Sequence, residues 1–455
     1  MAAIAGLHLV RFGTAADQTY LLNEFAPTYD QLIVNANTIA HMPAAMATFL
    51  AVRANKPFFI DPQTHAFQHE LEPLRSTSRK SAGKIKRSWE KLISRYGDPV
   101  QRSVLGEDRS ILPEDFANDD ECKAFVQRVV AFQLDELNDQ FKSGPDAAYV
   151  AYLAEAADRV NLVVPSLAVA PYFFLTPQFF DEWLNVNIRC LGYAREVARE
   201  RKVALAAQVV ISQDVLMLSE LCHQLVEAYS SAKPDVILLW IDSFSEHDQS
   251  TGELAAYVSL VSELSNISPV VNLYGGYFSI AAARFGQLRD KLVGVCHGLE
   301  YGETKPTVPI SGGVPVAKFY IPRLHERLSP RIATRIIRAL GGFDSVESFH
   351  RNICNCAMCQ TVIRRQPERE FGEYTATKIS TFWRSGRRVA MDFPTASASD
   401  LCTRHYMWCK HREYTDHTDL SSTREAFSRE FDALKRAVGL DYVGHCKTWP
   451  AALKS

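Results

Sequence analysis

Residues 205–212 read Leu-Ala-Ala-Gln-Val-Val-Ile-Ser, and residues 236–242 read Val-Ile-Leu-Leu-Trp-Ile-Asp. Both are short apolar runs rather than alternating ones, a pattern typical of strands that are buried on both faces. An amphipathic stretch of helical period lies between them, at 213–231. A strand, a helix and a second such strand predict a parallel sheet with right-handed crossovers.

The same alternation runs through the first 300 residues. Further runs of strand length lie at 7–12, 31–37, 57–61, 161–166, 269–275 and 292–298, and further helical stretches at 177–202, 252–265 and 278–291. Eight such strands favour an α/β fold with a closed (β/α)8 TIM barrel, and an open doubly wound sheet is the alternative. No Gly-x-Gly-x-x-Gly or Walker A sequence follows any of them, so no motif supports a nucleotide cofactor.

The spacing between the third and fourth predicted strands is irregular. Residues 62–160 separate them, which is too long for one crossover helix and predicts an insertion at about 70–150. Its first part, 75–95, holds eight basic residues and one acid, a local charge of +7. A solvated surface loop would explain this charge, and so would contact with nucleic-acid phosphates. The candidates for that contact are Arg79, Lys80, Lys84, Lys86 and Arg87.

The overall composition is that of an ordinary globular protein. The 455 residues are 47% apolar and carry 50 basic and 52 acidic side chains, a net charge of −2. These values exclude a disordered or coiled-coil chain, and ten cysteines are too few for a disulfide scaffold. There is no run of 18 apolar residues and no secretory signal pattern at the N-terminus. We therefore expect a cytoplasmic protein with no membrane partner.

Three cysteines are crowded into Cys354-Asn-Cys356-Ala-Met-Cys359. This spacing lets one loop place three thiolates around a tetrahedral cation, so it predicts a structural zinc ion. The segment 400–414 reads as a helix, and His405 on it is the best candidate for the fourth ligand, with Cys409 and His411 as alternatives. Buried thiols without a metal and an iron–sulfur cluster are the other interpretations.

With its neighbours, this motif resembles the zinc site of the tRNA-guanine transglycosylases, a family of zinc-bearing (β/α)8 barrels. Residues 32–39, Leu-Ile-Val-Asn-Ala-Asn-Thr-Ile, resemble the family's second strand, and 58–68, Phe-Phe-Ile-Asp-Pro-Gln-Thr-His-Ala-Phe-Gln, resemble its third. The resemblance implies that Asp61 is the family's active-site aspartate and that Gln208, on the fifth strand, binds a base. It covers roughly 6–300 and 350–415. It implies a catalytic barrel at 1–310 and a zinc-binding subdomain with C-terminal helices at 311–455.

The chain also departs from the family. The fourth predicted strand reads Val163-Val-Pro-Ser166 where the family has a base-reading Asp, and the place of the family nucleophile reads Val295-Cys-His-Gly-Leu-Glu300. The interval from Cys359 to His405 is longer than usual in the family. A second, weaker basic cluster consists of Arg384, Arg387 and Arg388. The departures and the two basic segments resemble a divergent branch that acts on DNA, exchanging guanine for a 7-deazaguanine such as 7-cyano-7-deazaguanine.

Base exchange at a glycosidic carbon needs a carboxylate nucleophile and benefits from a second carboxylate. In a barrel, both belong at the carboxyl ends of strands, where Asp61 and Asp242 are found. The sequence leaves open which of the two attacks. An aromatic ring can stack on a base that has been flipped out of the helix. Further pocket candidates are Asn37, Trp240, Tyr274, His297 and Glu300.

The resemblance therefore implies a DNA-guanine transglycosylase, a pentosyltransferase that uses a covalent glycosyl-aspartate intermediate. The same chemistry on tRNA is the nearest alternative. A catalytically silent nucleic-acid-binding barrel and an unrelated barrel hydrolase are the others. A helper protein, the oligomeric state and the identity of the inserted base stay open.

Overall fold

The computed structural model describes residues 4–13, 15–78, 81–143, 148, 152, 155, 163–299, 302–309, 316–384, 387–416 and 418–454. Contacts divide the chain into two compact units. The first unit comprises 1–244, 259–274 and 291–311, and the second comprises 245–258, 275–290 and 312–455. Among the described residues, no helix has both the length and the apolar character needed to cross a bilayer.

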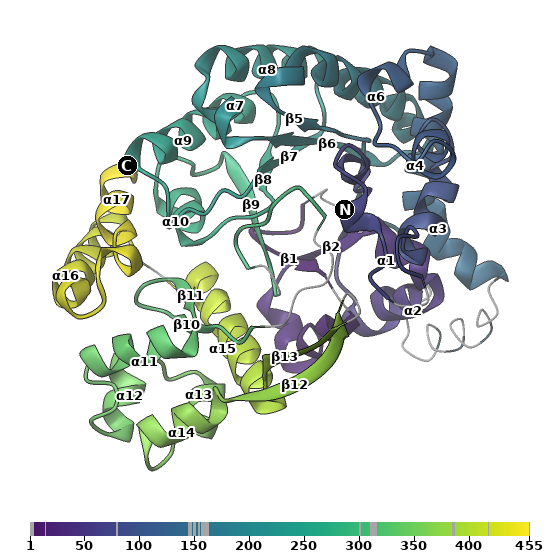
Figure 1. Cartoon of the computed structure of the whole chain (residues 1–455). Coiled ribbons are helices and arrows are strands. Elements are labelled where there is room, and N and C mark those ends of the chain that lie inside the picture. The colour runs from purple at the N-terminus through teal and green to yellow at the C-terminus, as the bar shows by residue number, and fades with distance from the viewer. Residues whose placement is uncertain are drawn as a thin grey trace. The chain divides into compact units, whose positions relative to one another are not determined.

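The first unit contains a nearly closed barrel of eight parallel strands, drawn in Figure 1. Around the barrel they are β3 (Phe58–Asp61), β2 (Gln31–Asn35), β1 (His8–Phe12), β9 (Leu292–Gly298), β8 (Val270–Asn272), β7 (Val236–Ile241), β6 (Ala204–Ile211) and β4 (Leu167–Val169). The two end strands meet where the Ser166 amide donates to the Phe58 carbonyl at 2.7 Å. A short strand, β5 (Phe174–Leu175), continues the pairing with β6.

Helices separate most of the consecutive strands in chain order, as expected for parallel crossovers. They are α1 (Ala36–His41), α2 (Pro43–Thr48), α3 (Arg87–Tyr96), α4 (Asp119–Ser143), α6 (Phe180–Arg201), α7 (Gln213–Met217), α8 (Ser219–Ala232), α9 (Thr251–Ser265) and α10 (Tyr277–Phe285). Both α3 and α4 lie between β3 and β4. The mixed α/β fold is therefore the predicted one at the level of strand order and strand direction.

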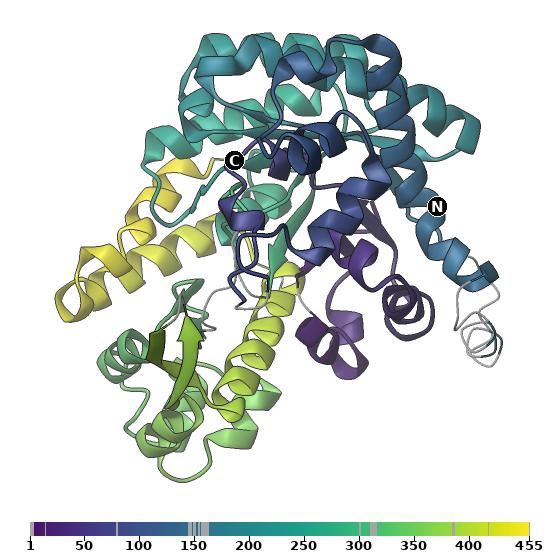
Figure 2. The same ribbon diagram turned by 45° about the vertical axis from the view of Figure 1, so that its right-hand side comes forward.

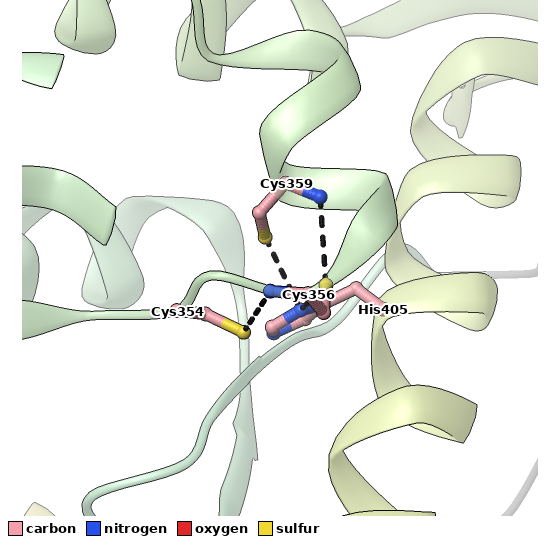
Figure 3. A group of neighbouring side chains, drawn as sticks. All are labelled: Cys354, Cys356, Cys359 and His405. Atoms are coloured by element: carbon pink, nitrogen blue, oxygen red, sulfur yellow. Dashed lines mark hydrogen bonds between the residues drawn. The ribbon is translucent and has the colours of Figure 1, made fainter. Parts of the chain in front are cut away.

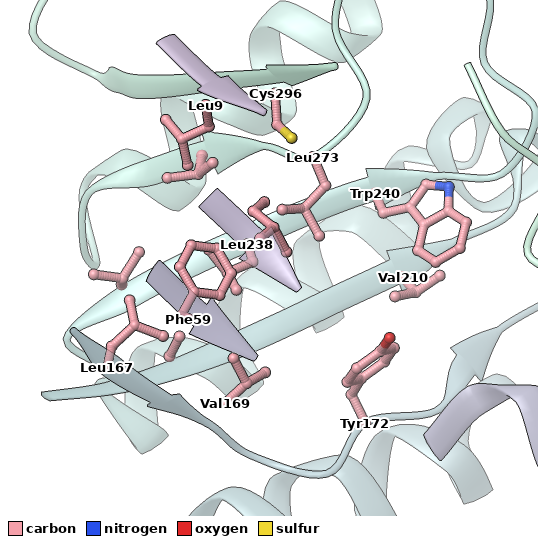
Figure 4. Close-up of a cluster of buried hydrophobic side chains, with 14 of the residues drawn as sticks. Leu9, Phe59, Leu167, Val169, Tyr172, Val210, Leu238, Trp240, Leu273 and Cys296 are labelled. Carbon is pink, nitrogen blue, oxygen red and sulfur yellow. The ribbon is translucent and has the colours of Figure 1, made fainter. Parts of the chain in front are cut away.

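Inward-facing side chains fill the barrel. Successive side chains of a strand point to opposite faces, so one residue in two faces the interior. Leu9, Phe59, Leu238 and Cys296 are among those that gather there, with Trp240 and Tyr172 at one end of the cluster, as Figure 4 shows. This packing makes the barrel a filled core and leaves its carboxyl-end mouth as the place for a site.

The fourth strand lies later in the chain than the sequence analysis predicts. Residues 163–166 have no strand structure, and β4 begins at Leu167. Pro165 has no amide hydrogen and cannot donate to a ladder, whereas the next three residues, Leu-Ala-Val, are small or apolar and fully buried. The prediction of a strand at 161–166 is therefore wrong for the described part of that segment.

The second unit carries two hairpins and a set of helices (Figures 1 and 2). The hairpin strands are β10 (Phe319–Ile321) with β11 (Glu326–Leu328), and β12 (Thr377–Arg384) with β13 (Arg387–Pro394). The helices after the barrel strands are α11 (Pro330–Ala339), α12 (Val346–Asn352), α13 (Ala357–Val362), α14 (Pro367–Tyr374), α15 (Ala396–Thr415), α16 (Leu420–Val438) and α17 (His445–Ala452).

Candidate functional site

A buried ion pair lies at the carboxyl ends of three neighbouring strands. Arg11, Asn35 and Asp61 each follow an interior residue by two positions, so all three face inward. The Arg11 guanidinium donates through Nη1 to Asn35 Oδ1 at 2.8 Å and to Asp61 Oδ2 at 2.7 Å. This ion pair fixes a cation and an anion at the mouth of the barrel.

The Asp61 carboxylate is already occupied on both oxygens. Besides the bond from Arg11, its Oδ1 accepts from the Tyr172 hydroxyl at 2.6 Å and from the Gln63 amide at 2.9 Å. Burial alone would raise the pKa of Asp61, but the Arg11 charge and the Tyr172 hydrogen bond outweigh it and lower the pKa. Only 1% of the residue is exposed. Asp61 is thus a buried, fixed anion.

Asp242, which directly follows β7, is held differently. Its Oδ1 accepts from the Thr307 amide at 2.5 Å, and the residue is only partly buried. Within the described chain, Oδ2 of Asp242 has no hydrogen-bond partner. The hydrogen bond to Oδ1 therefore orients the carboxylate and leaves Oδ2 available for contact with a ligand.

Aromatic rings and one lysine surround these carboxylates. His65 stacks on Tyr172 with centroids 5.2 Å apart and meets the Trp240 ring edge-on at 5.0 Å. The ring centroids of Tyr274 and Trp240 are 4.9 Å apart. Lys305 Nζ lies 5.3 Å from the Trp240 ring centroid. Flat apolar faces of this kind are suited to stacking a nucleobase.

Gln208 is the strongest indication of a ligand inside the barrel. It lies on the inward face of β6 between two interior residues, Ala206 and Val210, and pairs in register with Leu238, two residues before Trp240. The residue is 1% exposed, yet Oε1 and Nε2 have no hydrogen-bond partner among the described residues. An unsatisfied buried amide costs about 1–3 kcal/mol per group, which a bound base would recover.

His65 makes the stability of the barrel depend on pH. Burial lowers the pKa of His65 to about 3, from its ordinary 6.5. The unfolded chain therefore binds a proton below pH 6.5 while the folded chain does not, so stability is lost as the pH falls. From pH 8 to pH 5 we expect a loss of about 2 kcal/mol, since each pKa unit is worth about 1.4 kcal/mol.

Urea unfolding at the two pH values measures this loss. His65→Gln should reduce the measured loss by about 2 kcal/mol. The loss that remains comes from other buried histidines whose pKa is also lowered, such as His247 and His445. The exposed His223→Gln should leave the loss unchanged. An equal pH dependence in all three proteins would show that His65 is not its source. Protonation of Asp61 does not contribute to the loss of stability between pH 8 and pH 5, because its lowered pKa lies below this range.

The other predicted pocket residues are placed as follows. Tyr274 belongs to the interior cluster. Asn37 lies in α1, where its backbone amide donates to Gln63 Oε1 at 3.1 Å. His297 follows the interior Cys296 and so faces outward, with its Nε2 2.8 Å from His8 Nε2. This places His297 away from the barrel interior, and Glu300 lies outside the described residues.

The second unit brings together the three predicted thiols and His405. Ligand atoms of Cys354, Cys356, Cys359 and His405 all lie within 4.8 Å of one another, and all four residues are buried. Figure 3 shows them converging from α13, the loop before it, and α15. His405 Nδ1 is 3.4 Å from Cys356 Sγ and 3.3 Å from Cys359 Sγ. The cluster can hold a metal ion.

The donor set fits a tetrahedral metal site. Bonds of about 2.3 Å to sulfur and 2.0 Å to nitrogen would separate the two ligand atoms by about 3.5 Å, close to the observed spacing. His405 Nε2 lies 2.7 Å from the Tyr320 carbonyl, which requires the proton on Nε2 and leaves Nδ1 for a metal. Hydrogen bonding among the thiols holds the pKa of Cys354 well below its ordinary value, as a thiolate ligand needs.

A fourth cysteine lies beside the cluster. Cys409 Sγ is 3.9 Å from Cys354 Sγ and 3.6 Å from His405 Nδ1. His405 itself lies one helical turn earlier on α15 and stacks on Phe319, with centroids 4.2 Å apart. Of the sequence-based alternatives for the fourth ligand, the structure thus places His405 in the group and Cys409 next to it.

The basic segment is only partly available for binding. Lys86 Nζ donates to the Pro73 carbonyl at 2.8 Å, which uses one of the predicted phosphate contacts internally. Lys84 and Arg87 are exposed and line a groove of about 710 Å³. Arg79 and Lys80 lie outside the described residues. Lys86 is therefore less available for a phosphate contact in the folded protein than the sequence suggests.

Arg11, Tyr172, His65 and Lys305 were not among the predicted site residues. Arg11 could have been predicted from the sequence. It lies two positions after the apolar Leu9 in a buried strand, so its side chain faces the same side as that of Leu9. The contacts of the other three depend on loops that meet only when the barrel closes.

Comparison with known proteins identifies no relative: no family model and no curated protein matches the chain. The resemblance to the transglycosylases therefore stands on the residues described above.

Proposed function

We propose that the protein is a base-exchange transglycosylase that replaces guanine in DNA by a 7-deazaguanine, such as 7-cyano-7-deazaguanine. The observation that carries the proposal is the unsatisfied Gln208 amide inside a barrel whose mouth holds two carboxylates. A Cys3His cluster that follows the last barrel strand supports it, because that order resembles the transglycosylase family.

The chemistry assigned to the mouth is two successive displacements at C1′. Asp242 Oδ2 attacks C1′ as the bond from C1′ to guanine N9 breaks, and the departing base takes up one proton. The incoming base then attacks C1′ through N9, gives up its N9 proton and releases the Asp242 carboxylate. Bonds and protons balance over the cycle, and no redox partner is needed.

The remaining residues would bind and orient the base. Gln208 has both a donor and an acceptor to offer to a purine edge. Trp240 and Tyr274 would stack on the flipped base. Arg11 has Nε and Nη2 buried without partners among the described residues, so it can donate to the base or to the charge that develops on it. In this proposal Asp61 positions Arg11.

We assign the Cys3His cluster to a structural zinc ion. Three thiolates and one imidazole fill a tetrahedral shell and leave no position for water, so the ion would supply cross-linking rather than chemistry. It would join the loop at 354–356 and α13 to α15.

A silent nucleic-acid-binding barrel is the second candidate function. The observation that favours it is the occupied Asp61 carboxylate, which cannot attack a sugar while Arg11 and Tyr172 hold it. Oδ2 of Asp242, which accepts no hydrogen bond from the described residues, favours the transglycosylase over the silent barrel.

A labelling assay tests the proposal. The protein is incubated with labelled guanine or 7-cyano-7-deazaguanine and with duplex DNA, single-stranded DNA or tRNA, with and without a helper protein. We expect label in DNA. Label in tRNA alone would identify the tRNA alternative, and binding without label in any polymer would identify the silent barrel.

Gln208→Leu separates a ligand role from a structural one. The change removes two unsatisfied buried groups, so we expect the free energy of unfolding to rise by about 1–3 kcal/mol. The same change should weaken base binding by about 10-fold or more, since the donor and acceptor are lost. Urea unfolding and calorimetric titration with the free base measure the two effects. A destabilised variant would show that the amide is satisfied in the folded protein.

A further inference from the structure

The β12–β13 hairpin is a two-stranded ribbon with no third strand among the described residues. Its register is continuous over eight pairs, from Thr377 opposite Pro394 to Arg384 opposite Arg387. Eight residues per strand give a length of about 25 Å. An isolated hairpin is marginally stable in water. Here β13 contacts α15, and a partner along the ribbon would add further stability.

The ribbon has a basic sequence, and several of its described side chains are exposed. Residues 377–394 contain four basic residues, Lys378, Arg384, Arg387 and Arg388, and one acid, Asp392, for a net charge of +3. Lys378 and Arg388 are exposed. Ile379, which follows Lys378 and pairs with Asp392, is 75% exposed. Positive charge along a strand edge disfavours pairing with a strand of a second copy. The charge instead complements an anionic surface.

The ribbon is rooted between predicted metal ligands. Cys359 lies in α13 before the hairpin, and His405 lies in α15 after it. At the base, the Thr395 amide donates to the Ala376 carbonyl at 3.0 Å, and the Thr395 hydroxyl caps α15 by accepting from the Ala398 amide. The cluster therefore fixes both ends of the segment that carries the ribbon.

We infer that the β12–β13 ribbon is a DNA-binding element that enters the major groove of the duplex. The inference rests on the proposed function for the choice of nucleic acid. The major groove of B-DNA is about 12 Å wide and admits a two-stranded ribbon, whereas the major groove of A-form RNA is too deep and narrow. Lys378 and Arg388 contact phosphates, and the ribbon discriminates duplex DNA from duplex RNA.

Fluorescence anisotropy with labelled duplexes tests the ribbon. In Lys378→Gln/Arg388→Gln, loss of two phosphate contacts should weaken DNA binding at least about 10-fold at 0.1 M salt and reduce the salt slope by about 2. The matched control, Arg331→Gln/Lys447→Gln, removes two exposed charges of the same unit and should bind like wild type. Wild type should bind duplex DNA at least about 10-fold more tightly than duplex RNA.

The outcomes separate the ribbon from the proposed function. If wild type exchanges bases and binds DNA but the ribbon variant binds equally well, the ribbon inference is overturned and the function stands. Equal weakening in both variants, or equal affinity for duplex RNA, also overturns it. A wild type that neither binds nor modifies DNA contradicts the proposed function and the inference together. A dimer that the ribbon variant abolishes would identify a second copy as the partner.

Discussion

Asp242→Asn is expected to lower the rate of base exchange by about 10⁴-fold or more while leaving the fold intact. The carboxylate is the proposed nucleophile, and removal of a nucleophile typically costs rates of this order. The Asn side-chain oxygen can still accept from the Thr307 amide, so we expect the free energy of unfolding to change by less than about 1 kcal/mol. Label incorporation and urea unfolding measure the two quantities.

Asp61→Asn provides the contrast. It leaves the buried Arg11 without its counter-ion, which should cost about 3–5 kcal/mol of stability. The matched control for Asp242→Asn is Asp235→Asn. Asp235 lies at the opposite, amino end of β7, where its carboxylate accepts from the Leu205 amide. We expect it to retain exchange activity. Full activity in Asp242→Asn would remove this residue from the mechanism.

Cys356→Ser is expected to empty the metal cluster. Wild type should contain one zinc ion per chain, and the variant less than about 0.2, because a structural site that loses a thiolate loses most of its affinity. Metal binding is coupled to folding, so the unfolding temperature should fall by an amount on the order of 10 °C. Elemental analysis and differential scanning calorimetry measure these changes.

Two neighbouring thiols serve as controls for the cluster. Cys402 is a buried cysteine on α15, the helix that carries His405, but it does not belong to the group of four. Cys402→Ser should therefore keep the metal. Cys409→Ser should also keep it if His405 is the fourth ligand. Loss of zinc in Cys409→Ser together with retention in His405→Gln would assign the ligand to Cys409.

The barrel could be predicted because its signals are local. Continuous apolar runs predict buried parallel strands, and seven of the eight strands lie within the predicted segments to within a residue or two. The fourth strand was misplaced because Val163 and Val164 look strand-like in sequence, whereas Pro165 prevents a ladder there. The grouping of the thiols and His405 was also predictable, since close cysteine spacing and a helix face are local features.

The mouth of the barrel was less predictable because it depends on contacts between distant residues. Nothing in the sequence around Asp61 indicates that Arg11 and Tyr172 occupy its oxygens, since they lie 50 and 111 residues away. The use of Lys86 inside the fold could not be predicted, because its hydrogen bond to the Pro73 carbonyl joins residues that are 13 positions apart. The outward direction of His297 follows from strand alternation once its neighbour Cys296 is known to face inward.

Trapping the covalent intermediate tests the central claim most directly. The protein is mixed with duplex DNA in the presence of labelled base, denatured, digested and analysed by mass spectrometry. We predict a deoxyribose-linked strand attached to the peptide that contains Asp242, absent from Asp242→Asn. A wild-type protein that incorporates label with the adduct on Asp61, or that shows no incorporation and no adduct, would contradict the account.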